Sequence, residues 1–214
     1  MFNFIKRYWP TALAVLILLT ALTGVYAKYV IDQTLEEGKI TITAELGTIQ
    51  LLEHKAIKKA DGSYVLQGTD ANGQCDGTEH DHLDGSTEKP GNSYVLIPGL
   101  DIPKDPYVQI TDKTPIEVYV YLIVTEDSIT AKNITYQLKD HWKPISDGSK
   151  VYVYSDANGA KKVTADTTIP VLQDNTVYVS QDLSDLTGSV TLSFSACMKQ
   201  YVTDKTAQEI YSGT

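Results

Sequence analysis

Arginine and cysteine are scarce in this chain of 214 residues, which contains one arginine, Arg7, and two cysteines, Cys75 and Cys197. The formal net charge is -9 at pH 7. Nucleic-acid binding needs a basic surface, usually with arginines for bidentate phosphate contacts, so we expect this acidic chain to bind no nucleic acid. Two cysteines are too few for a disulfide-dense scaffold. Whether the two form a single bridge stays open.

Catalytic motifs are also lacking. The sequence contains no His-Glu-x-x-His zinc helix, no Gly-x-Ser-x-Gly elbow and no P-loop. His54 and His141 stand alone in polar segments, where a surface or turn role is the default interpretation. We therefore expect no enzymatic activity and no cofactor.

A polar segment over residues 69–92 has almost no apolar side chains, and we expect it to form a long exposed loop insertion. It contains Glu79, His80, Asp81 and His82, whose nitrogen and oxygen atoms are weak candidate ligands for zinc or another divalent ion. A metal site requires several ligands to converge, and a polar loop does not orient them. A solvated loop is the simpler interpretation, so we assign no metal site.

The N-terminus has the pattern of an export signal over residues 1–27. Lys6 and Arg7 precede an uncharged apolar run over residues 11–22, and the small residues Val25 and Ala27 follow at the positions that a signal peptidase reads. Cleavage after Ala27 would leave a mature chain that begins at Lys28.

An uncleaved membrane anchor is the alternative interpretation of this segment. Residues 8–27 contain no charge, and their length is close to what a membrane-spanning helix needs. In that case the protein would contact the membrane only through residues 1–27. Either interpretation places the remainder outside the cytoplasm, secreted or at the cell surface.

The mature region, residues 28–214, is expected to form a single all-β domain. Short segments in which apolar and polar residues alternate are separated by turn residues, as in a β-sandwich or barrel. The expected strands cover residues 40–44, 48–52, 63–67, 94–97, 107–111, 116–125, 134–138, 151–155, 176–180 and 189–198.

Two of these strands carry a more specific prediction. Residues 116–124 are apolar on both faces, which favours a central strand whose outer face is also partly covered. In residues 189–198 the alternation places Phe194 and Met198 toward the core and Cys197 on the opposite face. The only helix that we expect in residues 28–214 covers residues 204–211 and would fold against the sheet.

Tyrosine is abundant, with 14 tyrosines against 3 phenylalanines. Tyr119, Tyr121, Tyr152 and Tyr154 lie in alternating strands, where aromatic pairs across strands stabilise a sheet by about 0.2 to 1 kcal/mol each. An aromatic platform for sugars is the functional alternative. Packing within the sheet needs fewer assumptions.

Three segments together resemble the TasA/camelysin-like exported proteins of Gram-positive bacteria. Gly24-Val25-Tyr26-Ala27-Lys28-Tyr29 is similar to the family's pattern around the signal cleavage site. The segment Pro98-Gly99-Leu100-Asp101-Ile102-Pro103-Lys104-Asp105-Pro106 is similar to its PG-D-x-x-K-D-P element. Near the C-terminus, Ala196-Cys197-Met198-Lys199-Gln200 resembles an Ala-Tyr-Ala-x-Gln ending, with Cys and Met departing from it.

The resemblance implies a jelly-roll-like antiparallel β-sandwich, preceded by the signal helix and interrupted by the polar loop insertion. It also implies a structural role as a cell-surface or biofilm-matrix fibre subunit, with a dedicated signal peptidase as its partner during export. Fibre-forming members join subunits when an N-terminal strand of one completes the sheet of the next. Here the candidate donor strand is Lys28, Tyr29, Val30 and Ile31, which cleavage would free.

Two alternatives to the fibre subunit stay open. One is a membrane-anchored extracellular binding module, which requires residues 1–27 to be retained. The other is a metallopeptidase, an activity ascribed to camelysin relatives, but the sequence has no zinc motif to support it. For the Pro98-Gly99 element itself we expect a turn and a stiff corner between two sheets, with no chemistry.

Overall fold

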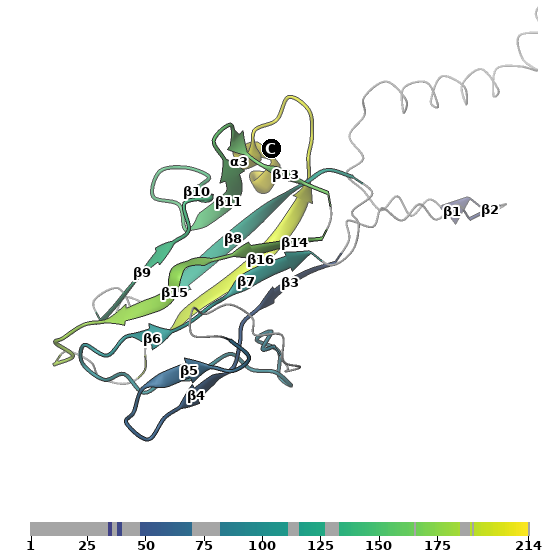
Figure 1. The fold of residues 1–214 in the computed structure, drawn as a ribbon. Helices are drawn as coiled ribbons and strands as arrows, with labels where there is room; N and C mark the ends of the chain where they lie inside the picture. The colour runs from purple at the N-terminus through teal and green to yellow at the C-terminus, as the bar shows by residue number, and fades with distance from the viewer. Residues whose placement is uncertain are drawn as a thin grey trace, which may run out of the picture. The chain divides into compact units, whose positions relative to one another are not determined.

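The computed structural model describes residues 34–35, 38–39, 48–69, 82–110, 116–126, 133–164, 166–184, 189 and 191–213 (Figure 1). The chain divides into two compact units, residues 1–44 and 45–214. In the first unit, β1 (Thr34–Leu35) and β2 (Gly38–Lys39) form an antiparallel pair. In the second unit, the described residues form antiparallel strands and one short helix of more than a single residue, which confirms the all-β prediction. The signal helix expected over residues 1–27 and the strand expected over residues 40–44 lie outside the described residues.

A six-stranded sheet is built around β8 (Val118–Glu126). Along one edge of β8 lies β16, and along the other lie β11 and β13, all antiparallel to it. The neighbours in this sheet are β10 (Trp142–Pro144), β11 (Val151–Asp156), β12 (Gly159–Ala160), β13 (Lys162–Val163) and β16 (Leu192–Gln200). The strand predicted from its two apolar faces is therefore central, as expected.

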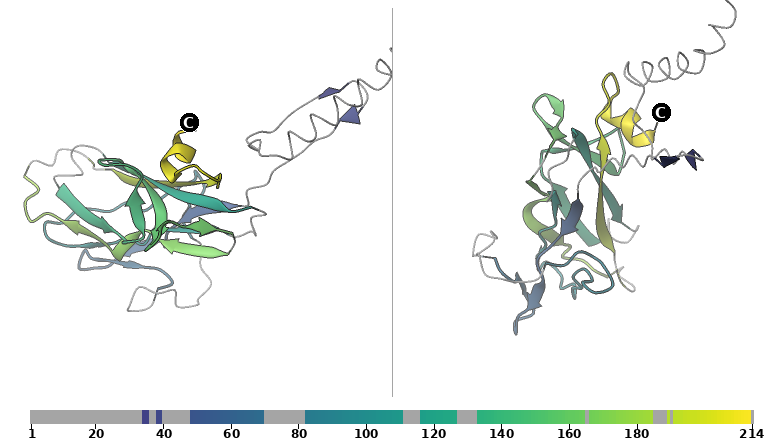
Figure 2. Two further views of the ribbon diagram at one scale, coloured as in Figure 1. Left: turned by 90° about the horizontal axis from the view of Figure 1, so that it is seen from above. Right: turned by 90° about the vertical axis from the view of Figure 1, so that its right-hand side faces the viewer.

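The opposite layer consists of two three-stranded ladders, β14-β7-β3 and β6-β15-β9 (Figures 1 and 2). The residues between β6 and β7 and between β14 and β15 join the ladders, and the Val171 amide donates to the Pro106 carbonyl at 2.9 Å across this junction. The strands are β3 (Ile49–Leu52), β6 (Ile102–Pro103), β7 (Tyr107–Ile110), β9 (Ile134–Leu138), β14 (Thr167–Pro170) and β15 (Leu172–Val179). A separate hairpin is formed by β4 (Ala56–Lys58) and β5 (Tyr64–Leu66).

The main hydrophobic core lies between the two layers. Both layers supply β-branched and leucine side chains to it, because alternate residues of each strand point to the same face. On β16, the side chains of Phe194, Ala196 and Met198 pack against this core, as the alternation predicted. Its fully buried members include Val108, Val118, Val120, Leu122, Val171 and Leu172.

The outer face of β8 is covered by the C-terminal helix α3 (Ala207–Ser212), which confirms the expected helix. Tyr119, Tyr121 and Val153 form a second buried cluster with Ile210 of this helix. The Tyr121 hydroxyl donates to the Ala207 carbonyl at 2.8 Å, so the helix is bonded to the sheet as well as packed on it. Tyr152 and Tyr154 instead pack on the main core, on the opposite face of their sheet.

The helix starts and ends at residues that its capping explains. Thr206 accepts from the Glu209 amide, and the Glu209 side chain accepts from the Thr206 amide, which together form a capping box. Gly213, with φ 76°, ends the helix in the left-handed conformation. A helix of six residues would be marginal alone, so its packing on Tyr119 and Tyr121 stabilises it.

The cysteine on this outer face is partly covered. Cys197 packs against the cluster around Ile210, and its thiol is free. Burial raises the pKa of Cys197, although Lys199 opposes the shift. The other cysteine, Cys75, lies outside the described residues.

A tight turn forms at Pro98-Gly99, as predicted, but residues 94–97 before it do not form the strand that we predicted there. Gly99 has φ +68°, and the Leu100 amide donates to the Ile97 carbonyl at 3.0 Å, as in a type II turn with proline at its second position. Before the turn, the Val95 amide donates to the Tyr64 hydroxyl at 2.8 Å instead of to a neighbouring strand. The predicted turn is confirmed, and the predicted strand over residues 94–97 is wrong because its backbone does not pair in a ladder.

We expect Gly99→Ala to lower the free energy of unfolding by about 1 kcal/mol, because alanine disfavours positive φ. The added Cβ would also overlap the Gln181 side chain, which must move. Gly148→Ala is the matched control, since Gly148 has φ +73° and no atom within 4 Å of the added Cβ. Urea unfolding of both variants measures the two costs, and an unchanged midpoint in Gly99→Ala would contradict the type II turn.

We also expect Cys197 to react slowly with iodoacetamide at pH 8, because its raised pKa keeps the thiol protonated. Tyr121→Phe removes the hydrogen bond to Ala207 and should speed alkylation about fivefold by loosening α3. Peptide mass spectrometry distinguishes Cys197 from Cys75, and Tyr178→Phe, at an exposed tyrosine, is the control. Equal rates in all three proteins would show that α3 does not protect the thiol.

Candidate functional site: buried ion pairs and an open sheet edge

Strand register brings two charged dipeptides together at one end of β3. Leu52 of β3 pairs with Tyr107 of β7 in an antiparallel ladder. Continuing this register past the ends of both strands places His54 opposite Asp105. The residues Glu53-His54 and Lys104-Asp105, about fifty positions apart in sequence, thus meet at the point where the ladder ends.

Two buried ion pairs result from this meeting. His54 Nδ1 lies 2.5 Å from Asp105 Oδ2, and the His54 amide donates to Asp105 Oδ1 at 3.1 Å. Lys104 Nζ donates to Glu53 Oε2 at 2.5 Å. His54 is only 5% exposed and Asp105 6%, so the surface role expected for His54 is wrong.

Opposing effects act on the Asp105 carboxyl group. Burial raises the pKa of Asp105, and the nearby Glu53 charge adds to the increase. The charge of His54 and the two hydrogen bonds from it lower the same pKa, yet the raised direction prevails. His54 thus offsets part of the cost of burying this carboxylate, and the two groups act as one unit.

The polar loop insertion over residues 69–92, here called the polar excursion, is bonded to Glu53 and His54. The Glu53 amide donates to the Leu83 carbonyl at 2.9 Å, and the Leu83 amide donates back at 2.8 Å. Asn92 holds the other end of the excursion, because its amide donates to Glu53 Oε1 at 2.9 Å and its side chain bonds the His54 carbonyl and the Ala56 amide. The part of the loop that the structure describes is therefore tied to Glu53 at both ends, while residues between them are exposed.

Of the four weak metal-ligand candidates, the structure describes only His82. Its Nδ1 lies 2.7 Å from the Tyr107 hydroxyl, and its ring meets the His54 ring edge-on with centroids 4.7 Å apart. Glu79, His80 and Asp81 lie outside the described residues. Within the described ranges, no three His, Cys, Asp or Glu side chains are grouped as metal ligands would be.

The Lys104-Asp105-Pro106 part of the family-like element has a role that the sequence did not reveal. We expected the element to act as a stiff corner without chemistry, but Lys104 and Asp105 each supply one half of a buried ion pair. The available signal was that Glu53-His54 and Lys104-Asp105 each combine an acidic and a basic side chain next to a predicted strand. Only the pairing of those strands shows that the dipeptides face each other.

We expect Lys104→Met to lower the free energy of unfolding by about 3 kcal/mol, because it leaves the Glu53 carboxylate buried without its cation. Adding Glu53→Gln should restore most of this loss, since glutamine keeps an acceptor for the Asn92 amide and removes the charge. Urea unfolding measures the free energy of unfolding of the wild type, the single variant and the double variant.

The control is Lys162→Met, which breaks the exposed pair with Glu117 and should cost much less. An equal loss in Lys104→Met and Lys162→Met would mean that burial adds nothing to the Glu53–Lys104 pair.

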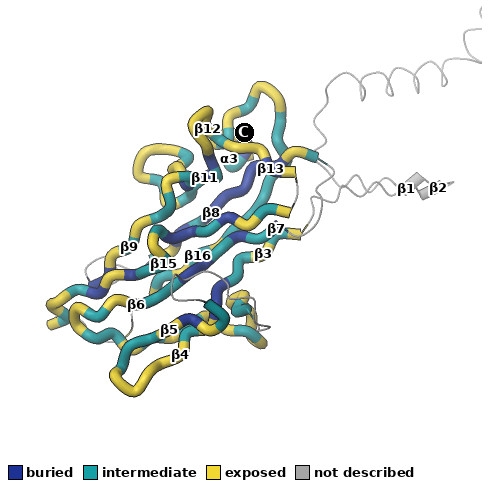
Figure 3. Tube along the Cα trace, in the orientation of Figure 1, coloured by how far each residue is buried: buried dark blue, intermediate teal, exposed yellow. Residues whose placement is uncertain are grey.

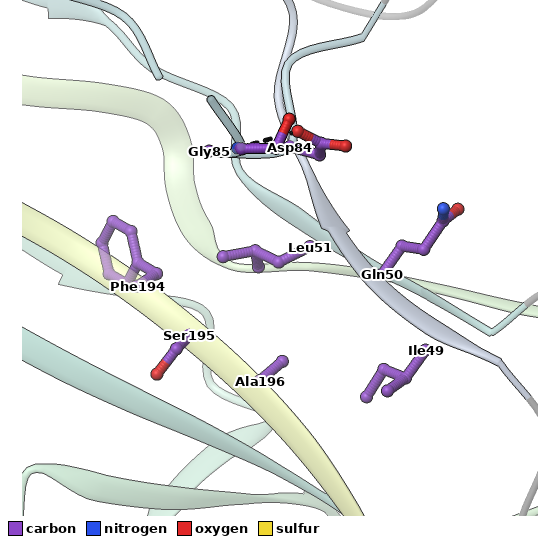
Figure 4. Close-up of a pocket in the computed structure, with 9 residues that line it drawn as sticks. Ile49, Gln50, Leu51, Asp84, Gly85, Phe194, Ser195 and Ala196 are labelled. Atoms are coloured by element: carbon purple, nitrogen blue, oxygen red, sulfur yellow. Dashed lines mark hydrogen bonds between the residues drawn. The ribbon is translucent and has the colours of Figure 1, made fainter. Parts of the chain in front are cut away.

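A second feature is the open edge of the six-stranded sheet. Of the strands that the structure describes, β16 pairs with β8 alone, and β3 pairs with β7 alone apart from the bridge at Glu53. These two edge strands, from opposite layers, lie beside each other (Figures 1 and 4). An unpaired strand edge can accept a further strand.

Hydrogen bonding shows which backbone groups face this edge. The Tyr201 amide donates to the Glu117 carbonyl at 2.8 Å, so in the register of β16 with β8 the odd-numbered residues bond to β8. The amides and carbonyls of even-numbered residues, such as Phe194, Ala196 and Met198, therefore point away from β8. On β3, Leu83 already occupies the edge at Glu53, so Ile49 and Leu51 are the β3 residues whose outward backbone groups pair with no described strand.

A groove of about 410 Å³ lies between the two edges. Figure 4 shows the side chains of Ile49, Leu51, Phe194 and Ala196 between the two strands, and Gln50 and Ser195 also line the groove. Residues 84–86 of the excursion close one end. The groove thus combines apolar side chains, among polar ones, with backbone groups of β16 that pair with no described strand, which is the chemistry that an added β-strand needs.

The predicted cleavage residues Val25, Ala27 and Lys28 and the candidate donor strand Lys28, Tyr29, Val30 and Ile31 lie outside the described residues. Comparison with known proteins returned no matching family model, no matching curated protein and no matching solved structure. Among the described segments, no helix has the length and apolar character to span a membrane.

Proposed function

We propose that this chain is an exported structural protein, a subunit of a cell-surface or biofilm-matrix fibre. Its domain would be a jelly-roll-like sandwich, and its subunits would join when the N-terminal strand of one copy enters the groove between β3 and β16 of the next. The observation that carries the proposal is the open edge of β16, a nine-residue strand with one described partner.

The chemistry of the donor segment suits this groove. Tyr29 and Ile31 would share one face of an extended strand, because alternate residues point the same way. That face would meet the apolar lining formed by Leu51, Phe194 and Ala196. The donor backbone would bond to the even-numbered residues of β16, whose edge is longer than the edge that Leu83 leaves open on β3.

In this proposal, export and assembly depend on the same cleavage. Cleavage after Ala27 would release the chain and create the free strand that begins at Lys28. The resemblance of the N-terminal, Pro98-Gly99 and C-terminal segments to TasA/camelysin-like proteins supports the same function. The proposal needs no catalytic step, and it places the ion pairs around Glu53 in a structural role.

Electron microscopy of purified residues 28–214 tests assembly directly. We expect fibres from the wild-type mature chain and none from a version that lacks residues 28–31. Ala196→Pro tests the acceptor edge, because it removes an amide that points away from β8 and leaves the ladder with β8 intact. This variant should also fail to form fibres while its thermal unfolding stays near that of the wild type.

A mixture of the two defective proteins sharpens the test. The chain without residues 28–31 keeps its groove, and Ala196→Pro keeps its donor strand, so together they should form heterodimers that sedimentation velocity detects. Longer fibres should not appear. A wild-type mature chain that stays monomeric at high concentration, with or without seeds, would rule out self-assembly.

A further inference from the structure

The β4–β5 hairpin has one face against the domain and one face in solvent. Leu66 is buried, and Tyr64 packs edge-on against Tyr94 with centroids 5.0 Å apart, so these even-numbered residues form the inner face. Ile57 and Val65 are paired across the two strands and are 47% and 37% exposed. They therefore lie on the outer face.

Two lysines flank this exposed aliphatic pair. The Gln67 amide donates to the Lys55 carbonyl at 2.8 Å, and the Lys59 amide donates to the Ser63 carbonyl at 2.7 Å, so the hairpin ladder extends to both residues. By strand alternation, Lys55 and Lys59 share the outer face with Ile57. Both lysines are exposed, and Figure 3 shows the hairpin as an exposed projection of the domain.

Apolar exposure is concentrated at this hairpin. Ile57, Val65 and Val95 are three of the four large hydrophobic residues exposed in the described part of the chain. Val95 lies at the inner face of the hairpin, because its amide donates to the Tyr64 hydroxyl, so Ile57 and Val65 are the aliphatic pair of the outer face. Clustered exposed aliphatic residues with a charged rim mark interaction surfaces.

The charge of the hairpin is opposite to that of the chain. Residues 55–67 contain Lys55, Lys58 and Lys59 against Asp61 alone, whereas the whole chain has a net charge of -9. The ion pairs found among the described residues involve other lysines, Lys104, Lys150 and Lys162. An anionic partner would be attracted by the hairpin and repelled by the chain's net charge, which defines one orientation of approach.

We propose that the outer face of the β4–β5 hairpin docks on an anionic lipid surface. Ile57 and Val65 insert at the level of the headgroups, and Lys55 and Lys59 pair with lipid phosphates on either side. The net charge of -9 averages over the whole chain and does not show this local reversal of charge. This surface is distinct from the groove between β3 and β16, so docking does not depend on fibre assembly.

A lipid surface fits this face better than a soluble polyanion. A polyanion in water would need the lysines only and would leave Ile57 and Val65 exposed. Acyl chains next to charged phosphates satisfy both kinds of side chain at once. Removing the aliphatic pair and reversing the lysine charges should therefore each weaken binding.

Tryptophan quenching in the full chain tests the docking directly. In Ile57→Trp, the new indole should be quenched by phosphatidylglycerol vesicles with brominated acyl chains at low salt, beyond the signal of the wild-type tryptophans. Phosphatidylcholine vesicles, or 0.5 M NaCl, should abolish this extra quenching. Lys143→Trp, at an exposed position on β10, controls for non-specific contact.

Charge reversal supplies the matched comparison. In the Ile57→Trp background, Lys55→Glu with Lys59→Glu should weaken partitioning by more than about 25-fold, since each lysine near an anionic surface contributes roughly a fivefold gain and each new carboxylate is repelled. Lys143→Glu with Lys161→Glu changes the net charge equally at other exposed sites and should leave quenching in place. Circular dichroism checks that each variant folds.

Three outcomes would overturn the proposal. They are the absence of extra quenching with phosphatidylglycerol, equal loss in both charge-reversed variants, and binding to dextran sulfate without binding to vesicles. Each of these can occur whether or not the mature chain forms fibres, so the result is separate from the test of assembly.

Discussion

Burial of β8 on both faces is the constraint on which the rest of the domain depends. Its valines enter the main core, and Tyr119 and Tyr121 lie under α3. A strand that is apolar on both sides must have neighbours along both edges and cover on both faces. β16 provides one neighbour, and its own outer edge then becomes the edge of the sheet. The groove beside β3 thus follows from the burial of β8.

The buried ion pairs lie near the end of this groove that residues 84–86 close. Glu53 and His54 bind Lys104 and Asp105 where β3 and β7 stop pairing, and the bridge from Glu53 to Leu83 places the polar excursion beside them. Buried ion pairs often contribute less to stability than to the choice of a single arrangement, and we apply that idea here as a hypothesis. In this domain the backbone bridge between Glu53 and Leu83 limits how far the β3 edge stays open, and the ion pairs lie where the ladder of β3 and β7 ends.

Local pattern predicted most of the longer elements and the short strands β3, β5 and β7, but it missed other short strands such as β4, β10 and β14. The expected strand over residues 134–138 coincides with β9, and the strand over residues 116–125 and the C-terminal helix were displaced by only a few residues, because alternation and capping are read within one segment. Strands of two or three residues, such as β6 and β13, are too short for a period to show. The apolar run over residues 94–97 looked like a strand, yet the Tyr64 hydroxyl takes the Val95 amide that a ladder would need.

The sequence alone determined the all-β class, the central position of the strand around Tyr121, the helix at the C-terminus and the face on which Cys197 lies. These properties depend on side-chain periods and on caps within a few residues of one another. Only the tertiary structure decided that His54 is buried against Asp105, that β16 is an edge strand beside β3, and that Ile57 and Lys55 share an exposed face. Each of these depends on which strands pair and in which register, and pairing joins residues whose separation along the chain leaves no local pattern.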